Sequence, residues 1–434
     1  MTQFICRPGN SVKGVIRVPG DKSISHRSII LSSIAEGTSQ VSGFLQGEDS
    51  LNTIKAFQQM GVSIERSQDQ VRIIGAGLHG LNEPDNDLDM GNSGTAMRLL
   101  LGLLAGQNFD SRLIGDSSLS SRPMQRVIQP LQMMGALIES EPGGRAPLQI
   151  RGNSELHAID YDMPVASAQV KSCLLLAGLY ADGETVVREP APTRDHSERM
   201  LRGFGCELSG QQSEIRIRGA QVLAARDVEV PADISSAAFF MVAASIADGS
   251  EITLQHVGVN PTRTGVINIL KLMGANIELV NQRDIGGEPV ADIRVKSAKL
   301  KGIEIPLYLV PLAIDEFPVL FIAAACADGT TRLSGAEELR VKESDRIQVM
   351  ADGLVTLGID AQTKSDGIII QGGELAGGEV ESHGDHRIAM AFSVASLCAN
   401  DEIHINDCAN VNTSFPGFVE LARTAGIRIS TNDQ

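Results

Sequence analysis

Five basic residues stand at or near the places where the sequence predicts a helix to begin. They are Lys22, Arg27, Arg98, Lys171 and Arg387. A cation at a helix N-terminus opposes the helix macrodipole, at a cost of roughly 0.3–1 kcal/mol each. The same helix end offers free N–H groups to an anion. Because a bound anion would remove the conflict, the pattern predicts a site for a small, multiply charged anion.

Further basic residues lie in loops between the predicted helices. They are Arg122, Arg126, Arg194, Lys342 and Arg346. A single exposed arginine usually makes a surface salt bridge of little energetic value. Their recurrence at similar places in a repeated pattern favours ligand binding instead. Guanidinium groups match phosphate and carboxylate groups through paired hydrogen bonds, so we expect a ligand that carries such groups.

A pattern that recurs six times positions these residues. Each copy has an apolar helix-like run, a break that usually has the form Ala-x-Gly, a β-rich segment, and a second helix-like run that ends in glycine. The six glycines are Gly61, Gly135, Gly205, Gly274, Gly358 and Gly426. Glycine suits the residue after a helix, which often adopts the left-handed conformation. Each copy is therefore interpreted as a β-α-β-α-β-β unit.

The first helix of each unit is unusually apolar, as residues 99–104, 173–176 and 239–244 show. Apolar residues on every side predict a helix that is buried all round. Three units around a common axis would place these helices inside and the sheets outside, so six units predict two domains. A single open, doubly wound α/β sheet is the alternative, but it requires no repeat.

The composition excludes several classes of partner. The formal net charge is −16, which repels nucleic acid and anionic membrane surfaces. The six cysteines form no C-x-x-C pair, which indicates reduced thiols and no zinc site. No apolar run approaches the roughly 20 residues that cross a bilayer, and the N-terminus lacks the apolar stretch of a signal peptide. We therefore expect a cytoplasmic protein with no nucleic-acid or membrane partner.

Four segments carry a resemblance to a known family. Residues 19–27, 91–98, 340–346 and 385–390 resemble signatures of the EPSP synthase family of enolpyruvyl transferases, in the order found there. The resemblance covers nearly the whole chain. The residue sequences of segments 19–27 and 167–171 resemble those of the class II branch of that family.

The resemblance implies an α/β fold of two inverse α/β domains, each with three βαβαββ units around buried parallel helices. This agrees with the repeat count. The N-terminal domain is expected at residues 20–231, and the C-terminal domain at residues 1–19 plus 232–434. Two crossovers, near 19–20 and 231–232, act as hinges. The family also implies a monomer that closes when its substrate binds.

The reaction that the resemblance implies needs two small substrates and no metal or organic cofactor. The enolpyruvyl group of phosphoenolpyruvate is transferred to the 5-hydroxyl of shikimate 3-phosphate. The hydroxyl adds to C2 as C3 is protonated, and the tetrahedral intermediate then eliminates phosphate. Addition needs a base for the hydroxyl and an acid for the methylene carbon, and elimination reverses both proton transfers.

The expected catalytic residues are Lys22, Asp315 and Glu343, with Asp315 on the 4- and 5-hydroxyls and Glu343 beside the methylene carbon. The residues expected to bind shikimate 3-phosphate are Lys22, Ser23, Arg27, Ser167, Ala168, Gln169, Arg194, Asp315 and Lys342. Those expected to bind phosphoenolpyruvate are Lys22, Gly94, Thr95, Arg122, Gln169, Glu343, Arg346 and Arg387.

Two positions remain open. Thr413 stands where many relatives of the other branch carry lysine, so one anion contact is either absent or supplied elsewhere. His386 precedes Arg387, and it either assists in binding or only belongs to the start of a helix.

Three alternatives compete with this interpretation. The sister enzyme that transfers enolpyruvate to UDP-N-acetylglucosamine usually carries a reactive loop cysteine, and no cysteine lies between Cys6 and Cys173. A non-catalytic anion-binding protein of the same fold would keep the cations but has no need for Asp315 and Glu343. An RNA-end-processing relative is disfavoured by the acidic net charge.

Overall fold

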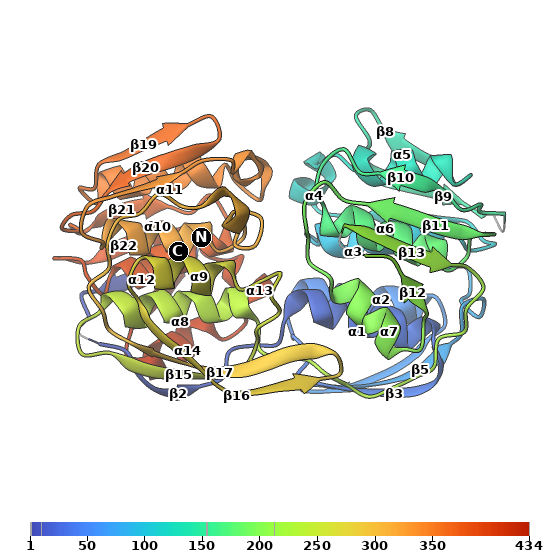
Figure 1. Cartoon of the computed structure of the whole chain (residues 1–434), viewed down its shortest axis with the longest axis horizontal. Helices are drawn as coiled ribbons and strands as arrows, with labels where there is room; N and C mark the ends of the chain where they lie inside the picture. The colour runs from blue at the N-terminus through green and yellow to red at the C-terminus, as the bar shows by residue number, and fades with distance from the viewer. Residues whose placement is uncertain (1, 10, 153–154, 212, 434) are drawn as a thin grey trace. The chain divides into compact units, whose positions relative to one another are not determined.

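The computed structural model describes residues 2–9, 11–152, 155–211 and 213–433. The chain divides into two compact units (Figure 1). Unit 1 comprises Met1–Pro19, Pro231–Asp284 and Pro289–Gln434, and unit 2 comprises Gly20–Val230 and Ile285–Glu288. The chain therefore passes from one unit to the other at residues 19–20 and 230–231.

Unit 2 contains three small sheets that share one strand order. In each sheet the first two strands are parallel and the other neighbours are antiparallel. The first sheet is β14 (Val228–Glu229), β3 (Glu36–Ser42), β5 (Gln70–Ala76) and β4 (Ser63–Ser67). The second is β6 (Leu88–Asp89), β7 (Ser111–Ile114), β9 (Arg145–Arg151) and β8 (Leu137–Glu141). The third is β10 (Asp160–Asp162), β11 (Glu184–Arg188), β13 (Glu214–Arg218) and β12 (Leu208–Ser209).

Unit 1 repeats this arrangement. Its first sheet is β2 (Lys13–Ile16), β15 (Glu251–Gly258), β17 (Glu288–Lys296) and β16 (Asn276–Ile285). The second is β18 (Thr330–Leu333), β20 (Gly367–Gln371) and β19 (Ala361–Lys364), and isolated parallel bridges replace its fourth strand. The third is β21 (Gly378–Glu381), β22 (Ile403–Asn406), β1 (Thr2–Arg7) and β23 (Arg428–Asp433). The N-terminal strand β1 thus completes the last repeat of the chain.

Three apolar helices form the centre of each unit. In unit 2 they are α1 (Lys22–Ile34), α3 (Gly94–Leu104) and α6 (Ala168–Gly178). In unit 1 they are α8 (Ile234–Ile246), α10 (Phe317–Ala325) and α12 (His386–Ala395), which pack against one another (Figure 1). All nine residues of α10 are buried. This confirms the predicted all-round burial, since a helix without a polar face has no side to turn toward water.

Six second helices cover the central ones. They are α2 (Glu48–Gln59), α5 (Gln125–Met133), α7 (His196–Gly203), α9 (Gly265–Leu272), α11 (Arg346–Thr356) and α14 (Phe418–Ala425). Shorter helical segments are α4 (Ser117–Ser121), α13 (Val411–Ser414), η1 (Leu307–Leu309) and η2 (Glu337–Val341). The six glycines predicted to end the second helices all have φ between +86° and +114°. That backbone region strains other residues, which explains why the repeat shows glycine there.

Five of the six central helices begin with a side-chain cap. The capping residues are Asp21, Ser93, Ser167, Asp233 and Asp385, each of which accepts a hydrogen bond from a backbone N–H of its own helix. The first of these helices begins at Lys22 and is capped by Asp21. The aspartate was available one residue before the helix, and its carboxylate reaches the Ile24 N–H.

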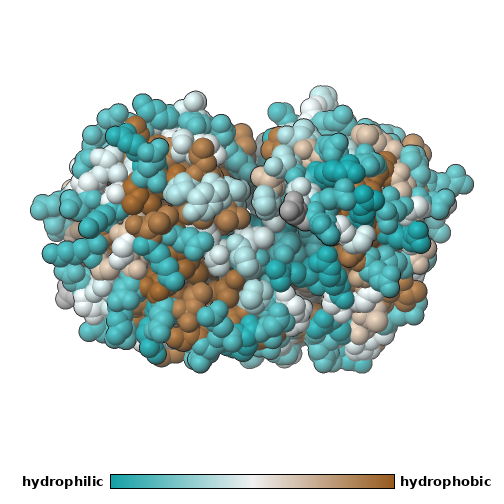
Figure 2. All heavy atoms as spheres, viewed as in Figure 1, coloured by the Kyte–Doolittle hydropathy of each residue, from teal (hydrophilic) through white to brown (hydrophobic). Residues whose placement is uncertain are grey.

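The surface and the cysteines agree with the composition. Hydrophilic side chains cover most of the face shown in Figure 2. All six cysteines are free, and four of them are buried. Within the described part of the chain, no helix has the length and apolar character needed to cross a membrane.

Candidate active site

Arg27 of α1 lies buried among hydroxyl groups, with 5% of its surface exposed. Its Nε donates to Ser197 Oγ at 2.7 Å, its Nη2 to Ser172 Oγ at 2.8 Å, and its Nη1 to the Ser23 carbonyl at 3.0 Å. Burial lowers the pKa of Arg27 to about 10, although Glu198 and other carboxylates nearby oppose that shift. The guanidinium therefore remains charged at neutral pH.

The hydrogen-bond partners of Arg27 among the described residues are all neutral. A buried charge without a paired counter-charge is costly, so a bound anion would stabilise this arrangement. Arg194 lies close enough to lower the pKa of Arg27, which adds a second cation to the same place. We call Ser23, Arg27, Ser172, Arg194 and Ser197 the Arg27 cluster.

Lys22, at the first position of α1, pairs with a carboxylate that sequence reasoning missed. Its Nζ contacts Asp49 Oδ2, and Asp49 is buried in the first turn of α2. Acidic residues in the first turn of a helix are common because they complement the macrodipole. Because Glu48 and Asp49 fit this ordinary pattern, nothing in the sequence indicated that Asp49 pairs with Lys22. The pair forms because α2 packs against α1.

The starts of α3 and α6 meet in a second group of predicted residues. Gln169 Nε2 donates to Thr95 Oγ1 at 2.9 Å, and Arg98 Nη1 donates to Gln169 Oε1 at 2.7 Å. A Cβ on Gly94 would lie 2.9 Å from Arg98 Nη1 and 3.6 Å from Arg122 Nη1, so glycine leaves space beside both guanidinium groups. The helix-start pattern identified Arg98, which lies in a segment that resembles the family but was not among the substrate-binding residues that the resemblance implies.

Three more predicted binding residues lie in unit 2, namely Ser167, Ala168 and Arg122. Ser167 caps α6 through a hydrogen bond from the Val170 N–H at 3.4 Å, and Ala168 is the first residue of that helix. Arg122 Nη2 donates to Asn92 Oδ1 at 2.8 Å. Arg122 thus joins the group at the start of α3.

Lys171 does not fit the expectation of an anion-binding cation. It is buried, and its Nζ lies 3.1 Å from Glu189 Oε2 and 2.7 Å from Glu198 Oε1. Two carboxylates already balance its charge. The helix-start argument is therefore wrong for Lys171, because the fold supplies counter-charges from Glu198 in α7 and from Glu189, the residue after β11.

In unit 1, the predicted site residues gather around Arg346, whose exposed fraction is 1%. Its Nε lies 2.8 Å from Asp385 Oδ2, its Nη2 lies 2.6 Å from Glu343 Oε2, and its Nη1 lies 3.6 Å from Asp315 Oδ1. Burial alone would lower the pKa of Arg346, but the three carboxylates raise it above its ordinary value. Burial likewise opposes ionisation of Asp385, yet Arg346 keeps the pKa of Asp385 below its usual range.

Asp315 connects the remaining predicted residues of unit 1. Lys342 Nζ lies 3.5 Å from Asp315 Oδ1, and Arg387 Nη1 donates to the Asp315 carbonyl at 2.9 Å. We call Asp315, Lys342, Glu343, Arg346, Asp385 and Arg387 the Arg346 cluster. Asp385 is the one member that the sequence did not indicate, since it also caps α12 and its ion pair with Arg346 forms only in the folded chain.

The two open positions lie at helix starts. His386 is buried at the first position of α12. Thr413 lies in α13, and its hydroxyl donates to the Asn410 carbonyl at 2.7 Å. Thr413 therefore has a local partner of its own.

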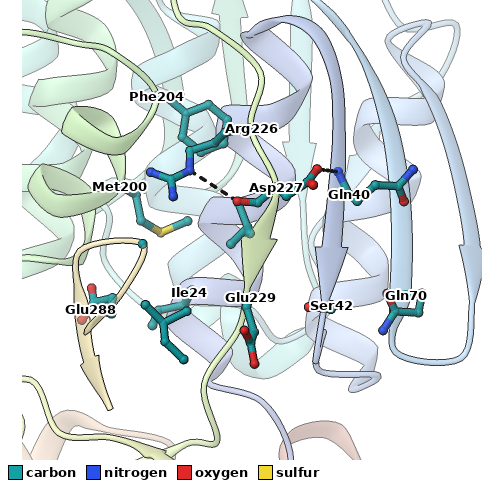
Figure 3. Close-up of a pocket in the computed structure, with 13 residues that line it drawn as sticks. Ile24, Gln40, Ser42, Gln70, Met200, Phe204, Arg226, Asp227, Glu229 and Glu288 are labelled. Carbon is teal, nitrogen blue, oxygen red and sulfur yellow. Dashed lines mark hydrogen bonds between the residues drawn. The ribbon is translucent and has the colours of Figure 1, made fainter. Parts of the chain in front are cut away.

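One cavity of unit 2 lies away from the place where the predicted residues gather. It has a volume of about 470 Å³ in unit 2, with Ile24, Met200 and Phe204 among its apolar lining and Glu229 and Glu288 among its carboxylates (Figure 3). None of the predicted site residues lines it. Among the described residues, no group of three or more His, Cys, Asp or Glu side chains is arranged to hold a metal ion.

The arrangement of charges indicates the chemistry. The Arg27 cluster presents a charged guanidinium on neutral supports, which suits the binding of an anion. The Arg346 cluster combines carboxylates that can exchange protons with cations that can hold phosphate or carboxylate groups.

Comparison with known proteins gives a consistent answer. The chain matches the family described as EPSP synthase (3-phosphoshikimate 1-carboxyvinyltransferase) over residues 6–421. It is 63% identical over 433 residues to the 3-phosphoshikimate 1-carboxyvinyltransferase of Alkalilimnicola ehrlichii, covering 99% of this chain and 97% of that one. The Methylococcus capsulatus protein of the same name is 63% identical over 430 residues, covering 99% and 98%. The solved EPSP synthase of Acinetobacter baumannii aligns with a TM-score of 0.92 at 56% identity, covering all of both chains.

Proposed function

Because this chain belongs to the EPSP synthase family, we propose that its two clusters bind and convert that family's two substrates. The enzyme is a transferase of the shikimate pathway. It transfers the enolpyruvyl group of phosphoenolpyruvate to the 5-hydroxyl of shikimate 3-phosphate and releases phosphate. The predicted family, fold class and reaction are confirmed. The UDP-N-acetylglucosamine alternative is not favoured.

The unit 2 residues have a binding role in this proposal. Arg27 and Arg194 contact the anionic groups of shikimate 3-phosphate, together with Ser23, Ser167, Ala168 and Gln169. Gly94, Thr95 and Arg122 hold phosphoenolpyruvate, whose phosphate and carboxylate suit guanidinium groups and free N–H groups. The observation that supports this assignment is Arg27, a buried cation with neutral hydrogen-bond partners.

The unit 1 carboxylates have a proton-transfer role. Asp315 accepts the proton of the 5-hydroxyl as its oxygen bonds to C2, while Glu343 donates a proton to C3. Elimination then breaks the bond between C2 and the phosphate oxygen as C3 returns a proton. Lys22 supplies positive charge to both substrates and acts as a further acid or base. Lys342, Arg346 and Arg387 orient the carboxylates and bind substrate anions.

The first test is phosphate release from phosphoenolpyruvate, measured with shikimate 3-phosphate, with UDP-N-acetylglucosamine, and with neither. Release only with shikimate 3-phosphate is the expected result. Release with the sugar nucleotide would identify the sister reaction, and no release from folded protein would favour the non-catalytic binding protein.

Two variants then test the proton-transfer roles. Asp315→Asn and Glu343→Gln preserve side-chain volume but remove the ionisable group. Each is expected to lower kcat by roughly 10²–10⁴-fold, the usual contribution of a positioned acid or base. A variant with native kcat would remove that residue from the proton-transfer scheme.

The organisation of the protein beyond the site is also a proposal. Residues 20–231 form one domain, residues 1–19 plus 232–434 form the other, and the crossovers near 19–20 and 231–232 act as hinges. The chain is a monomer, which light scattering after gel filtration tests. It resides in the cytoplasm, because the reducing conditions there keep thiols such as these six cysteines free. Cell fractionation tests this location.

A further inference from the structure

Helix α10 begins differently from the other five central helices. Its N-cap residue is Glu316, and the Glu316 side chain makes no hydrogen bond to the helix that it precedes. A capping side chain stabilises the helix start by accepting a hydrogen bond from a free backbone N–H. Asp315, the carboxylate proposed to accept the hydroxyl proton, is the residue immediately before Glu316.

The Glu316 carboxylate instead contacts a neighbouring central helix. Ser235 Oγ, in the first turn of α8, donates a hydrogen bond to Glu316 Oε1. Glu316 is buried, with 2% of its surface exposed. A hydrogen bond of this kind, formed to a charged group away from water, is among the stronger polar interactions in proteins.

A buried arginine completes this contact. Arg263 Nη2 donates to Ser235 Oγ at 2.7 Å and lies 3.6 Å from Glu316 Oε1. The same nitrogen lies 3.4 Å from Oδ1 of Asp233, the residue that caps α8. Glu316 is therefore bonded to the start of α8 through a hydroxyl and an arginine, both of which are buried.

The main chain at Asp315 is thus held from two directions. On one side, Arg387 Nη1 donates to the Asp315 carbonyl at 2.9 Å. On the other side, the next residue is anchored by Ser235 and Arg263. The Asp315 side chain meanwhile points to Lys342 and Arg346, 3.5 Å and 3.6 Å away.

We propose that Glu316, held by Ser235 and Arg263, is a positioning residue that fixes the Asp315 carboxylate for proton transfer. The proposal rests on the role assigned to Asp315 above. Glu316 forgoes the capping bond of its own helix because its carboxylate ties that helix start to α8. A small displacement of a reacting group can lower a rate by about 10²-fold, so such an anchor has catalytic value.

The test is a double-mutant cycle between positions 316 and 315, since interacting residues show non-additive effects. Glu316→Ala is expected to lower the single-turnover rate constant by about 10- to 100-fold. This constant is measured from product formation with enzyme in excess, which also resolves slow variants. In an Asp315→Asn background, the same substitution is expected to change the rate by less than about twofold.

Conservative variants sharpen the test. Glu316→Gln keeps an amide oxygen that can accept from Ser235, so it should retain most of the rate that Glu316→Ala loses. Ser235→Ala removes the bridging hydroxyl but leaves both charged partners, and it should lower kcat in the same direction by a smaller factor. This variant also keeps the proposal testable if Glu316→Ala does not fold.

A core variant controls for general destabilisation. Val295 is fully buried in β17, and Val295→Ala should lower the Tm without changing kcat. If Glu316→Ala lowers the rate equally in both backgrounds, or not at all, the positioning role is wrong. If Asp315→Asn by itself keeps a native rate, Asp315 is not the proton acceptor. That outcome is distinct from a failure of the positioning role of Glu316.

Discussion

Arg27 in unit 2 and Arg346 in unit 1 are both buried arginines, but their surroundings differ in charge. Arg27 donates to two serine hydroxyls and a carbonyl, whereas Arg346 contacts the carboxylates of Asp385, Glu343 and Asp315. Burial lowers the pKa of Arg27 to about 10, and the three carboxylates raise the pKa of Arg346.

The contrast teaches that one residue type can serve two tasks in the same protein. Neutral partners orient Arg27 without cancelling its charge, so that charge remains available to an anionic substrate. Around Arg346, three carboxylates balance the charge, and Arg346 keeps the pKa of Asp385 below its ordinary value. Four experiments test whether this difference governs stability and binding.

The largest expected effect is on stability. Arg346→Met would leave three carboxylates in place without their common cation, and removing one partner of a buried ion pair typically costs about 3–5 kcal/mol. Urea unfolding would measure this loss. Arg340→Met is the matched control, since Arg340 pairs with Asp345 near the surface at 2.6 Å and should cost at most about 1 kcal/mol. Equal losses would contradict the distinction.

The next effect is on substrate binding. Arg27→Met should raise the KM for shikimate 3-phosphate by roughly 10- to 100-fold, because a hydrogen bond to a charged group contributes about 1.5–3 kcal/mol. Its free energy of unfolding should fall by less than half the Arg346→Met loss, since Arg27 has no ion pair among the described residues. A large stability loss with an unchanged KM would reverse the comparison.

A smaller effect should follow from making Arg27 resemble Arg346. Ser172→Asp would place a carboxylate 2.8 Å or so from the guanidinium, where Ser172 Oγ now accepts. We expect the KM for shikimate 3-phosphate to rise about tenfold, equivalent to about 1.4 kcal/mol. Ser172→Asn controls for size without adding charge. If both variants raise KM equally, charge neutralisation is not the cause.

The smallest expected effect is a dependence of stability on pH. Arg346 holds the folded-state pKa of Asp385 below its ordinary value. A depressed carboxyl pKa contributes stability above the unfolded-state pKa of about 3.9, and that stability is lost as pH falls through the lower, folded-state pKa. Urea unfolding between pH 7 and 3 should therefore show a steeper acid loss in the wild type than in Arg346→Met. Identical slopes would contradict the assigned cause.

Much of the fold was predictable because its signals are local. The glycines at the ends of the second helices, such as Gly135 and Gly274, mark positions where the backbone itself requires positive φ. The apolar central helices were visible for the same reason, since all-round hydrophobicity is a property of a short segment. The family resemblance placed Arg346 and Asp315 in one site, and the two side chains lie 3.6 Å apart in the folded chain.

Other site residues could not be identified in this way because their partners lie far away in the sequence. Asp49 looked like an ordinary helix-start acid until the fold placed it on Lys22. Lys171 looked like an anion-binding cation, but Glu189 and Glu198 neutralise it.

The sequence by itself determined the six-unit repeat, the buried helices and the cations and carboxylates for which site roles are proposed. These follow from backbone sterics and hydrophobic periodicity, which act over a few residues. Only the tertiary structure decided which charges are paired, that β1 completes the last sheet, and that Glu316 bonds to α8 rather than capping α10. Such choices depend on Coulomb and hydrogen-bond interactions between groups that meet only when the chain has folded.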